Sequence, residues 1–185
     1  MPLLELLGVV KDWGLEPIFS GVSFKIEEGQ KIGLVGPNGT GKTSLLNILA
    51  GLDGDFKGRI LRKPGLVVAL VPQRYEPPDA LSCVEVLLES SAEIRASLDS
   101  LAERLASADG SGGQAALEEY GELSSRYEAL GGDFAEERAR RLLAKAGLAA
   151  VADAPASSLS GGEKNVLALA FALASEPELI LLDEP

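Results

Sequence analysis

The sequence contains a single cysteine and no long hydrophobic run, and these two shortages exclude several classes of protein. A lone cysteine, Cys83, cannot form an internal disulfide framework or a metal site built from several cysteines. No apolar stretch approaches the roughly 20 residues that a membrane-spanning helix requires. The start of the chain, residues 1–5, has no basic flank of the kind found in a secretory signal. We therefore expect a cytoplasmic protein in which Cys83 is a small core hydrophobe.

Negative charge is concentrated in the middle of the chain. The formal net charge is −11, and residues 75–137 hold fifteen acidic residues against three arginines. The remaining residues hold thirteen acids and fourteen bases, so they do not repel a nucleotide. A strongly acidic middle is a poor surface for a nucleic-acid backbone, and we expect no direct DNA binding. The simplest interpretation of the acidic segment is a set of solvated helical faces.

The order of the predicted elements favours a sheet domain interrupted by a helical one. A chain of 185 residues that is 46% hydrophobic can bury one substantial core. Helical spacing dominates from Leu81 to Ala146, with turns at residues 109–113 and Gly131-Gly132. Strands are predicted at residues 3–10, 22–26, 31–35, 58–61, 66–71 and 179–182. The strands therefore flank the helical segment on both sides, as expected for an α/β protein with an insertion.

A glycine-rich loop at residues 36–43 carries the clearest chemical signal. Its sequence, Gly-Pro-Asn-Gly-Thr-Gly-Lys-Thr, matches G-x-x-x-x-G-K-[ST] and lies between a predicted strand and a predicted helix at residues 44–50. Glycines let the backbone wrap closely enough for its N–H groups to point at phosphate oxygens, and the helix adds its positive N-terminal end. We predict that Lys42 reaches the β- and γ-phosphates and that the Thr43 hydroxyl coordinates Mg²⁺.

Two acidic side chains directly follow the final apolar strand. Asp183 and Glu184 emerge at the carboxyl end of this strand, which is where open α/β sheets bind ligands. We expect Asp183 to hold Mg²⁺, directly or through water, and Glu184 to polarise the attacking water in phosphoryl transfer. Gln73 follows an earlier strand and is a weaker candidate, since an uncharged amide could bind the metal or a water molecule.

A second anion site is predicted at residues 159–164, Leu-Ser-Gly-Gly-Glu-Lys. Ser160 and Glu163 have the spacing of a capping box, and Gly161 and Gly162 leave backbone amides bare at a helix N-terminus. In isolation this pattern is most often only a capped helix. The phosphate loop would already bind one triphosphate. A second anion-binding helix N-terminus therefore suggests a nucleotide that is held by a partner.

Four motifs together resemble an ATP-binding cassette (ABC) domain, and the resemblance covers nearly the whole chain. In chain order they are the phosphate loop, Gln73, Leu-Ser-Gly-Gly-Glu from residue 159 and the final Leu-Ile-Leu-Leu-Asp-Glu-Pro. The resemblance implies an α/β P-loop NTPase with an N-terminal antiparallel β part and an inserted α-helical subdomain. It also implies an ATPase that uses ATP and Mg²⁺. The implied division is an ATP-binding core at 1–78, a helical subdomain at 79–158 and, at 159–185, the signature helix and Walker B strand. Residues 1–185 would form one incomplete ABC domain.

The resemblance also assigns roles to single residues. Cassettes of this family pack head to tail in pairs, so Ser160, Gly161 and Gly162 would meet the γ-phosphate bound by a second cassette, in the same chain or in a dimer. Trp13 falls where the family places an adenine-stacking aromatic, with a buried core tryptophan as the alternative. The implied catalytic residues are Glu184, Lys42 and Gln73, and the implied metal ligands are Thr43, Gln73 and Asp183. The implied nucleotide contacts in the loop are Gly36, Asn38, Gly39, Gly41, Lys42, Thr43 and Ser44.

Within the family, the chain is most similar to the first cassette of the F subfamily. These are soluble twin-cassette proteins without a membrane domain, and many are ribosome-associated translation factors. The similarity is carried by residues 31–36, 127–132 and 159–164. It implies an ATPase that acts on the ribosome. The alternatives are the ATP-binding subunit of a membrane transporter, which would dock on a transmembrane permease, and a regulatory fragment that binds nucleotide without turnover.

The sequence departs from the family pattern in two respects. Residues 165–167, Asn-Val-Leu, and Phe171 occupy a helix that commonly carries arginines in this family. The chain contains no histidine, so the switch histidine of the family is absent, and the sequence ends at Pro185. From these departures we expect the given chain to bind ATP with little turnover.

Overall fold

The computed structural model describes residues 2–14, 16–107 and 113–184, and the chain divides into two compact units. The first unit comprises residues 1–74 together with 177–185, and the second comprises residues 75–176. Residues 159–176, which include the predicted signature helix, therefore belong to the second unit, and the chain returns to the first unit at Pro177. The domain boundaries at 78 and 158 remain a prediction.

The first unit contains a three-stranded antiparallel sheet in the order β2-β1-β3. Its strands are β1 (Leu4–Trp13), β2 (Glu16–Ile26) and β3 (Lys57–Arg62). Alternation along β1 puts Leu4 and Leu6 on the buried face, where they share a core with Leu45 and Leu49 of helix α1 (Lys42–Ala50). This core fixes the helix that follows the glycine-rich loop. The N-terminal antiparallel β part that the resemblance implied is present.

Two parallel strands complete the first unit. β4 (Val68–Val71) pairs with β5 (Leu179–Leu182), and Val68 lies opposite Leu179. The apolar run at 179–182 is thus confirmed as a strand. The predicted end of α1 is also confirmed, because Gly51 adopts a left-handed conformation with φ 82° and closes the helix. These elements place the end of β5 and the start of α1 in one unit.

The predicted strand at residues 31–35 is wrong. This segment has no regular secondary structure, and 55% of Ile32 and 94% of Val35 are exposed. A groove of about 640 Å³ runs between residues 31–34 and β5. A strand exists only through hydrogen bonds to a neighbour, and none of the strands in the described residues pairs with this segment. The apolar pattern alone therefore could not decide its conformation.

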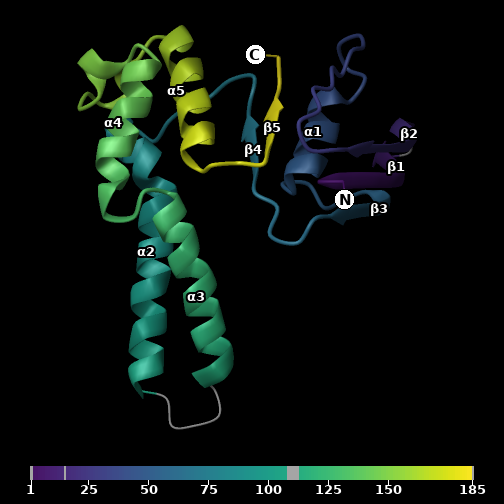
Figure 1. Ribbon diagram of the computed structural model, residues 1–185. Coiled ribbons are helices and arrows are strands. Elements are labelled where there is room, and N and C mark those ends of the chain that lie inside the picture. The colour runs from purple at the N-terminus through teal and green to yellow at the C-terminus, as the bar shows by residue number, and fades with distance from the viewer. Residues whose placement is uncertain (1, 15, 108–112, 185) are drawn as a thin grey trace. The chain divides into compact units, whose positions relative to one another are not determined.

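The second unit is helical, as its sequence pattern predicts. Its long helices are α2 (Cys83–Ser107), α3 (Gly113–Ala129), α4 (Ala135–Lys145) and α5 (Gly161–Ala174). Short 3₁₀ helices are η1 (Gly132–Phe134), η2 (Ala149–Val151) and η3 (Ala156–Ser158). α2 and α3 run side by side as a long antiparallel pair (Figure 1). Within the described residues, no helix has the length and apolar character needed to cross a membrane.

Apolar residues from several of these helices form the main core of the second unit. Val86 of α2, Leu143 of α4 and Leu167 of α5 are fully buried in it, and Cys83 lies beside them as the core hydrophobe that we expected. Burial raises the pKa of the Cys83 thiol, which keeps it protonated. The turn at Gly131-Gly132 is confirmed by positive φ angles at both residues. Of the other predicted turn, at residues 109–113, residues 109–112 lie outside the described residues.

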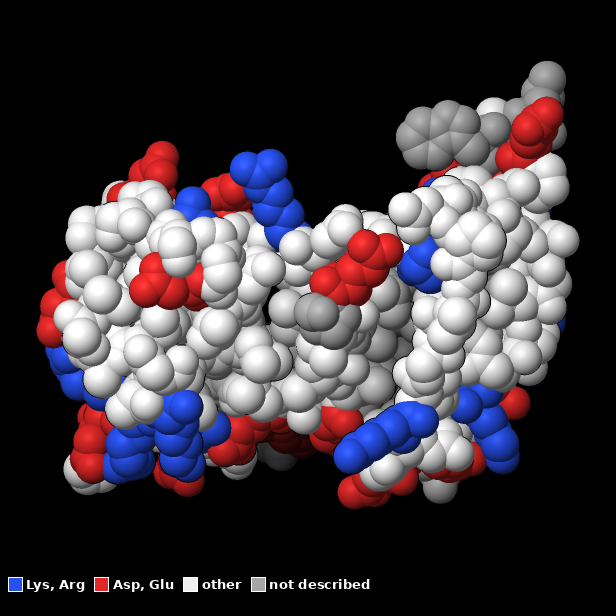
Figure 2. All heavy atoms as spheres, turned by 90° about the horizontal axis from the view of Figure 1, so that it is seen from above, with Lys and Arg blue, Asp and Glu red and all other residues white. Residues whose placement is uncertain are grey.

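Ion pairs accompany the acidic side chains of the second unit. Arg141 contacts Glu137 four residues before it on α4, and Arg95 pairs with Asp99 on α2. Figure 2 shows blue basic side chains next to red acidic ones at several places on the face that it presents. Exposed pairs of this kind contribute little to stability, because water already solvates both partners. These helical faces are therefore acidic but locally interleaved with arginines.

Candidate nucleotide site

The glycine-rich loop leads directly into the first turn of α1. Gly41 caps this helix with φ 86°, and a Cβ atom at its position would lie 2.4 Å from Ile18 Cγ2. Gly39 also has a left-handed φ, of 82°. Both positions therefore require glycine, Gly39 for its backbone angle and Gly41 also for the close approach of β2. The loop consequently presents backbone amides at the positive end of α1, the arrangement that suits an anion.

The Lys42 side chain folds over this loop. Its Nζ atom donates to the carbonyl oxygens of Gly36, at 2.9 Å, and Pro37, at 3.1 Å. The Glu184 carboxylate lies 3.9 Å from the same Nζ atom, and only 18% of the Lys42 side chain is exposed. The ammonium group is thus held at the mouth of the loop, where phosphate oxygens can replace the carbonyls as its hydrogen-bond partners.

Polar groups from distant parts of the sequence converge beside Lys42. Thr43 Oγ1 donates a 2.8 Å hydrogen bond to Asp183 Oδ2, although 140 residues separate the two. Gln73 Nε2 donates to Glu184 Oε2 at 2.6 Å. Asp183 is buried, and its backbone N–H donates to the Val71 carbonyl of β4. The parallel pair β4 and β5 therefore delivers Gln73, Asp183 and Glu184 to one edge, at the start of α1.

A pocket of about 480 Å³ opens over these groups, within the size range of sites for small ligands. Its lining residues are Ile18, Asn38, Gly39, Gly41, Lys42, Thr43, Ser44, Gln73 and Glu184. All but Ile18 are candidate residues from the sequence. Ile18 was missed because β2 was predicted only from residue 22, whereas it begins at Glu16. The alternation of apolar residues Ile18, Val22 and Phe24 along one strand was too interrupted to reveal it.

The donor set of this site fits Mg²⁺. Mg²⁺ prefers oxygen ligands, binds through one or two carboxylates and keeps several waters or phosphate oxygens in its shell. Asp183 and Thr43 present a carboxylate and a hydroxyl in contact with each other, and Gln73 adds an amide next to Glu184. No group of three histidine, cysteine or acidic side chains gathers around a metal-sized space in the described part of the chain. A weakly liganded Mg²⁺ that arrives with a nucleotide matches this arrangement.

Four further predicted site residues are not among the described residues that line this pocket. The backbone of Trp13 ends strand β1, but its side chain is outside the described part of the structure, so adenine stacking stays a prediction. Ser160, Gly161 and Gly162 belong to the second unit and not to the unit that holds the glycine-rich loop. A Cβ atom at Gly161 or Gly162 would meet nothing within 4 Å, so this backbone is open to an approaching group.

The predicted capping box at the start of α5 is confirmed. The Ser160 side chain accepts a hydrogen bond from the Glu163 N–H, while the Glu163 carboxylate accepts from the Ser160 N–H at 2.9 Å and from its hydroxyl at 2.6 Å. These hydrogen bonds lower the pKa of Glu163, because they stabilise the ionised carboxylate. The reciprocal bonds fix the turn that carries the two glycines.

The start of α5 should therefore loosen in acid. Because the pKa of Glu163 is lower in the folded protein than its ordinary value of 4.5, the stabilisation is present above pH 4.5 and is lost as the pH falls through the folded pKa. Amide exchange of residues 163–166, measured against pH, should rise at low pH relative to α4. Glu163→Gln keeps a capping oxygen without a charge and should remove this rise. Equal profiles in both proteins would contradict the assignment.

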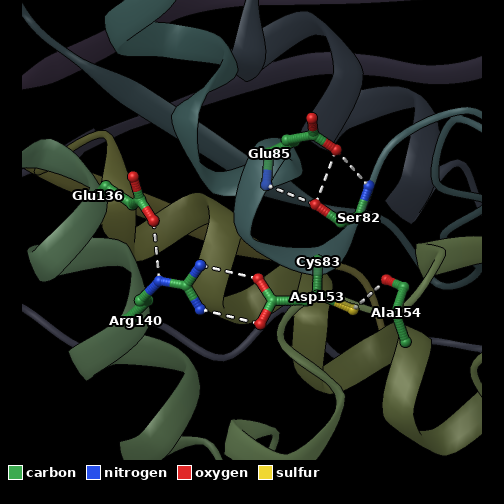
Figure 3. A network of polar contacts seen from close by, with 7 residues as sticks. All are labelled: Ser82, Cys83, Glu85, Glu136, Arg140, Asp153 and Ala154. Atoms are coloured by element: carbon green, nitrogen blue, oxygen red, sulfur yellow. Dashed lines mark hydrogen bonds and ion pairs between the residues drawn. The ribbon is translucent and has the colours of Figure 1, made fainter.

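A second network holds the loop that leads into this turn (Figure 3). The Arg140 guanidinium makes two hydrogen bonds to Asp153, at 2.7 and 3.2 Å, and one to Glu136 at 2.9 Å. The backbone N–H of Cys83 donates to the Ala154 carbonyl. Paired charges of this geometry raise the pKa of Arg140 and lower that of Asp153. The loop before residues 160–162, which we call the signature turn, is thus held by both α4 and α2.

Three features define a P-loop NTPase with a helical insertion. They are a phosphate-binding loop at the start of a helix, the pair of Thr43 and Asp183, and Glu184 at the end of the parallel strand β5. Residues 19–185 match the family model described as ABC transporter. The chain therefore belongs to the ABC transporter family, and it is an ABC ATPase domain.

Known proteins of the family resemble the chain along nearly its whole length. The tylosin resistance ATP-binding protein TlrC of Streptomyces fradiae is 38% identical over 98% of this chain, which covers 34% of TlrC. The zinc import ATP-binding protein ZnuC of Alkalilimnicola ehrlichii is 31% identical over 99% of the chain, covering 56% of ZnuC. A solved ATP-binding subunit of an ABC transporter superposes with a TM-score of 0.68 at 21% identity, over 98% of this chain and 65% of its own. The chain spans between a third and about half of these two curated relatives.

Proposed function

We propose that the first unit binds Mg-ATP and that Glu184 promotes its hydrolysis. The observation that carries this proposal is the meeting of Lys42, Thr43, Gln73, Asp183 and Glu184 at the start of α1. In this proposal Lys42 and the loop amides bind the β- and γ-phosphates, and Thr43 and Asp183 hold Mg²⁺, which neutralises charge on the phosphates. Glu184 then orients and polarises the attacking water, and Gln73 keeps its carboxylate in place.

The signature turn is proposed to serve the nucleotide of a second cassette. Ser160 and the open backbone of Gly161 and Gly162 face solvent at the N-terminal end of α5, and the capping box fixes their conformation. The partial positive charge at this end favours a γ-phosphate. The first unit already contains its own phosphate loop. Hydrolysis would therefore require two cassettes, in one chain or in a dimer, and each would complete the site of the other.

For the whole protein we propose ATP-driven transport, with a transmembrane permease as the second partner. Membership of the ABC transporter family and the similarity to ZnuC, a zinc import protein, support a transporter subunit. This proposal replaces the ribosome as our first expectation. A twin-cassette protein acting in translation is the second candidate. Its support is the length of TlrC, of which this chain covers only 34%, so that a second cassette has room in such a protein.

Fractionation of the source cells separates these two candidates. The protein with Glu184→Gln, kept in its ATP-bound form, should be recovered in detergent extracts of membranes together with a subunit that contains apolar spans of about 20 residues. The unchanged protein without ATP is the matched control. Sedimentation with ribosomes, and absence from the membrane extract, would overturn the transporter proposal and favour the translation candidate.

A further inference from the structure

The segment that follows Gln73 packs against the signature helix within the second unit. The ring of Tyr75 stacks on Phe171 of α5, with centroids 6.5 Å apart and planes 19° from parallel. Both rings lie against the main core of this unit, and burial is the larger cause that raises the pKa of Tyr75. Two aromatic faces at this spacing attract each other and resist sliding, because offset stacking has a preferred geometry.

The next residue, Glu76, makes a second contact with α5. Its Oε2 atom lies 2.9 Å from Nζ of Lys164. Only 19% of the Lys164 side chain is exposed, whereas 56% of the Glu76 side chain is exposed, so water screens this pair on one side. Lys164 is in the first turn of α5, and its N–H donates to the Ser160 carbonyl at 2.9 Å. The pair therefore acts on the turn that contains the signature glycines.

The two contacts together restrain α5 more than either could alone. Lys164 and Phe171 are seven residues apart, which places them on the same side of the helix and about 10 Å apart along its axis. The core packing of Leu167 and Ala170 already holds the middle of this helix. The two contacts of residues 75 and 76 add restraints at its first turn and at Phe171. Phe171 departs from the usual family pattern, and its stacking on Tyr75 gives it a definite role here.

We propose that Tyr75 and Glu76 form a two-point clamp that positions the signature turn, Ser160 to Gly162, for the phosphate of a partner cassette. This inference rests on the proposed function of that turn. Tyr75 and Glu76 are positioning residues, because they act through Phe171 and Lys164 and touch no reacting atom. Both contacts of the clamp, Tyr75 with Phe171 and Glu76 with Lys164, lie within the second unit.

Charge variants test the clamp in the whole chain by amide exchange. Glu76→Gln should raise the exchange of residues 164–166 about 5-fold and leave α4 unchanged, because the lost ion pair acts only on the start of α5. Glu93→Gln, which removes an exposed acid from α2, should change neither region. The exchanged pair, Glu76→Lys with Lys164→Glu, should restore slow exchange. A uniform rise over α2, α4 and α5, or no rise in α5, would overturn the clamp.

Kinetics of the two-cassette protein distinguish positioning from simple stabilisation. Phe171→Ala should lower kcat about tenfold at unchanged KM, since ATP still binds the glycine-rich loop while the opposing turn is displaced. Phe171→Tyr keeps the ring and should recover kcat. A change confined to KM would refute the positioning role. If the unchanged protein fails to bind ATP, the nucleotide proposal fails, and the exchange experiment still decides whether the clamp exists.

Discussion

Replacing Lys42 by alanine is expected to weaken ATP binding about 100-fold. The Lys42 ammonium would bind two phosphate groups, and hydrogen bonds to charged partners contribute about 1.5–3 kcal/mol each. A net loss equal to one of these interactions, about 2.7 kcal/mol, corresponds to 100-fold in the dissociation constant. Among the described residues, the ammonium contacts the loop carbonyls of Gly36 and Pro37 and, at 3.9 Å, Glu184. Isothermal titration with Mg-ATP measures the effect.

The matched control for this variant is Lys25→Ala. Lys25 lies on β2, is 62% exposed and pairs with Glu27, so its removal changes the net charge equally without touching the pocket. ATP affinity should then stay within about twofold of the original value, because surface charges at a distance are screened. Equal weakening by both substitutions would show that only the overall charge matters. Unchanged binding in Lys42→Ala would refute the phosphate-loop assignment.

Replacing Glu184 by glutamine should lower ATP hydrolysis by two to four orders of magnitude while ATP still binds. A positioned general base contributes about 10²–10⁴ to the rate. Glutamine keeps the size of the side chain and can still contact Gln73, which now lies 2.6 Å from the Glu184 carboxylate, but it cannot accept a proton from water. Phosphate release by the two-cassette protein, at saturating Mg-ATP, measures the loss.

Glu28→Gln provides the comparison for this second variant. Glu28 is exposed after β2 and does not line the pocket, so turnover should remain near that of the original protein.

The Glu184→Gln substitution should also change the ATP-bound state. If the two proposed cassettes lie on separate chains and hydrolysis ends their pairing, Glu184→Gln should accumulate as an ATP-bound dimer, visible as a larger species by light scattering. Full turnover in Glu184→Gln would remove Glu184 from the catalytic role.

Local sequence patterns were sufficient wherever the structure depends on neighbours in the chain. The capping box at Ser160 and Glu163 needs only residues within one turn, and it formed as predicted. The left-handed stop at Gly51 is equally local. The strand at 179–182 was predictable from its continuous apolar run, but the expected burial on both faces is not seen, because only Leu181 is buried and Leu182 is exposed. These elements also position the most specific motifs of the site.

Contacts between distant segments were beyond the reach of the same reasoning. Ile18 lines the pocket only because β2 is longer than its apolar pattern suggested and passes close to Gly41. The contacts of Glu76 with Lys164, 88 residues away, leave no periodic trace in the sequence. The segment at 31–35 has a strand-like composition, but composition cannot supply a partner for its hydrogen bonds. Sequence patterns therefore identified the candidate reactive residues, but they did not identify the contacts between distant segments that hold those residues in position.

Within the part of the chain that the structure describes, the segment at 31–35 and one side of β5 have no strand partner, and this has a consequence for handling the protein. Apolar residues Ile32, Leu34 and Val35 are 46–94% exposed, and the first two line a groove together with residues of β5, which among the described residues pairs only with β4. An edge of this kind is a template for any extended polypeptide. The isolated chain should therefore aggregate as its concentration rises, through intermolecular β-structure that dyes for cross-β fibrils would detect. Titrations with ATP are best made in dilute solution, where folded molecules seldom meet.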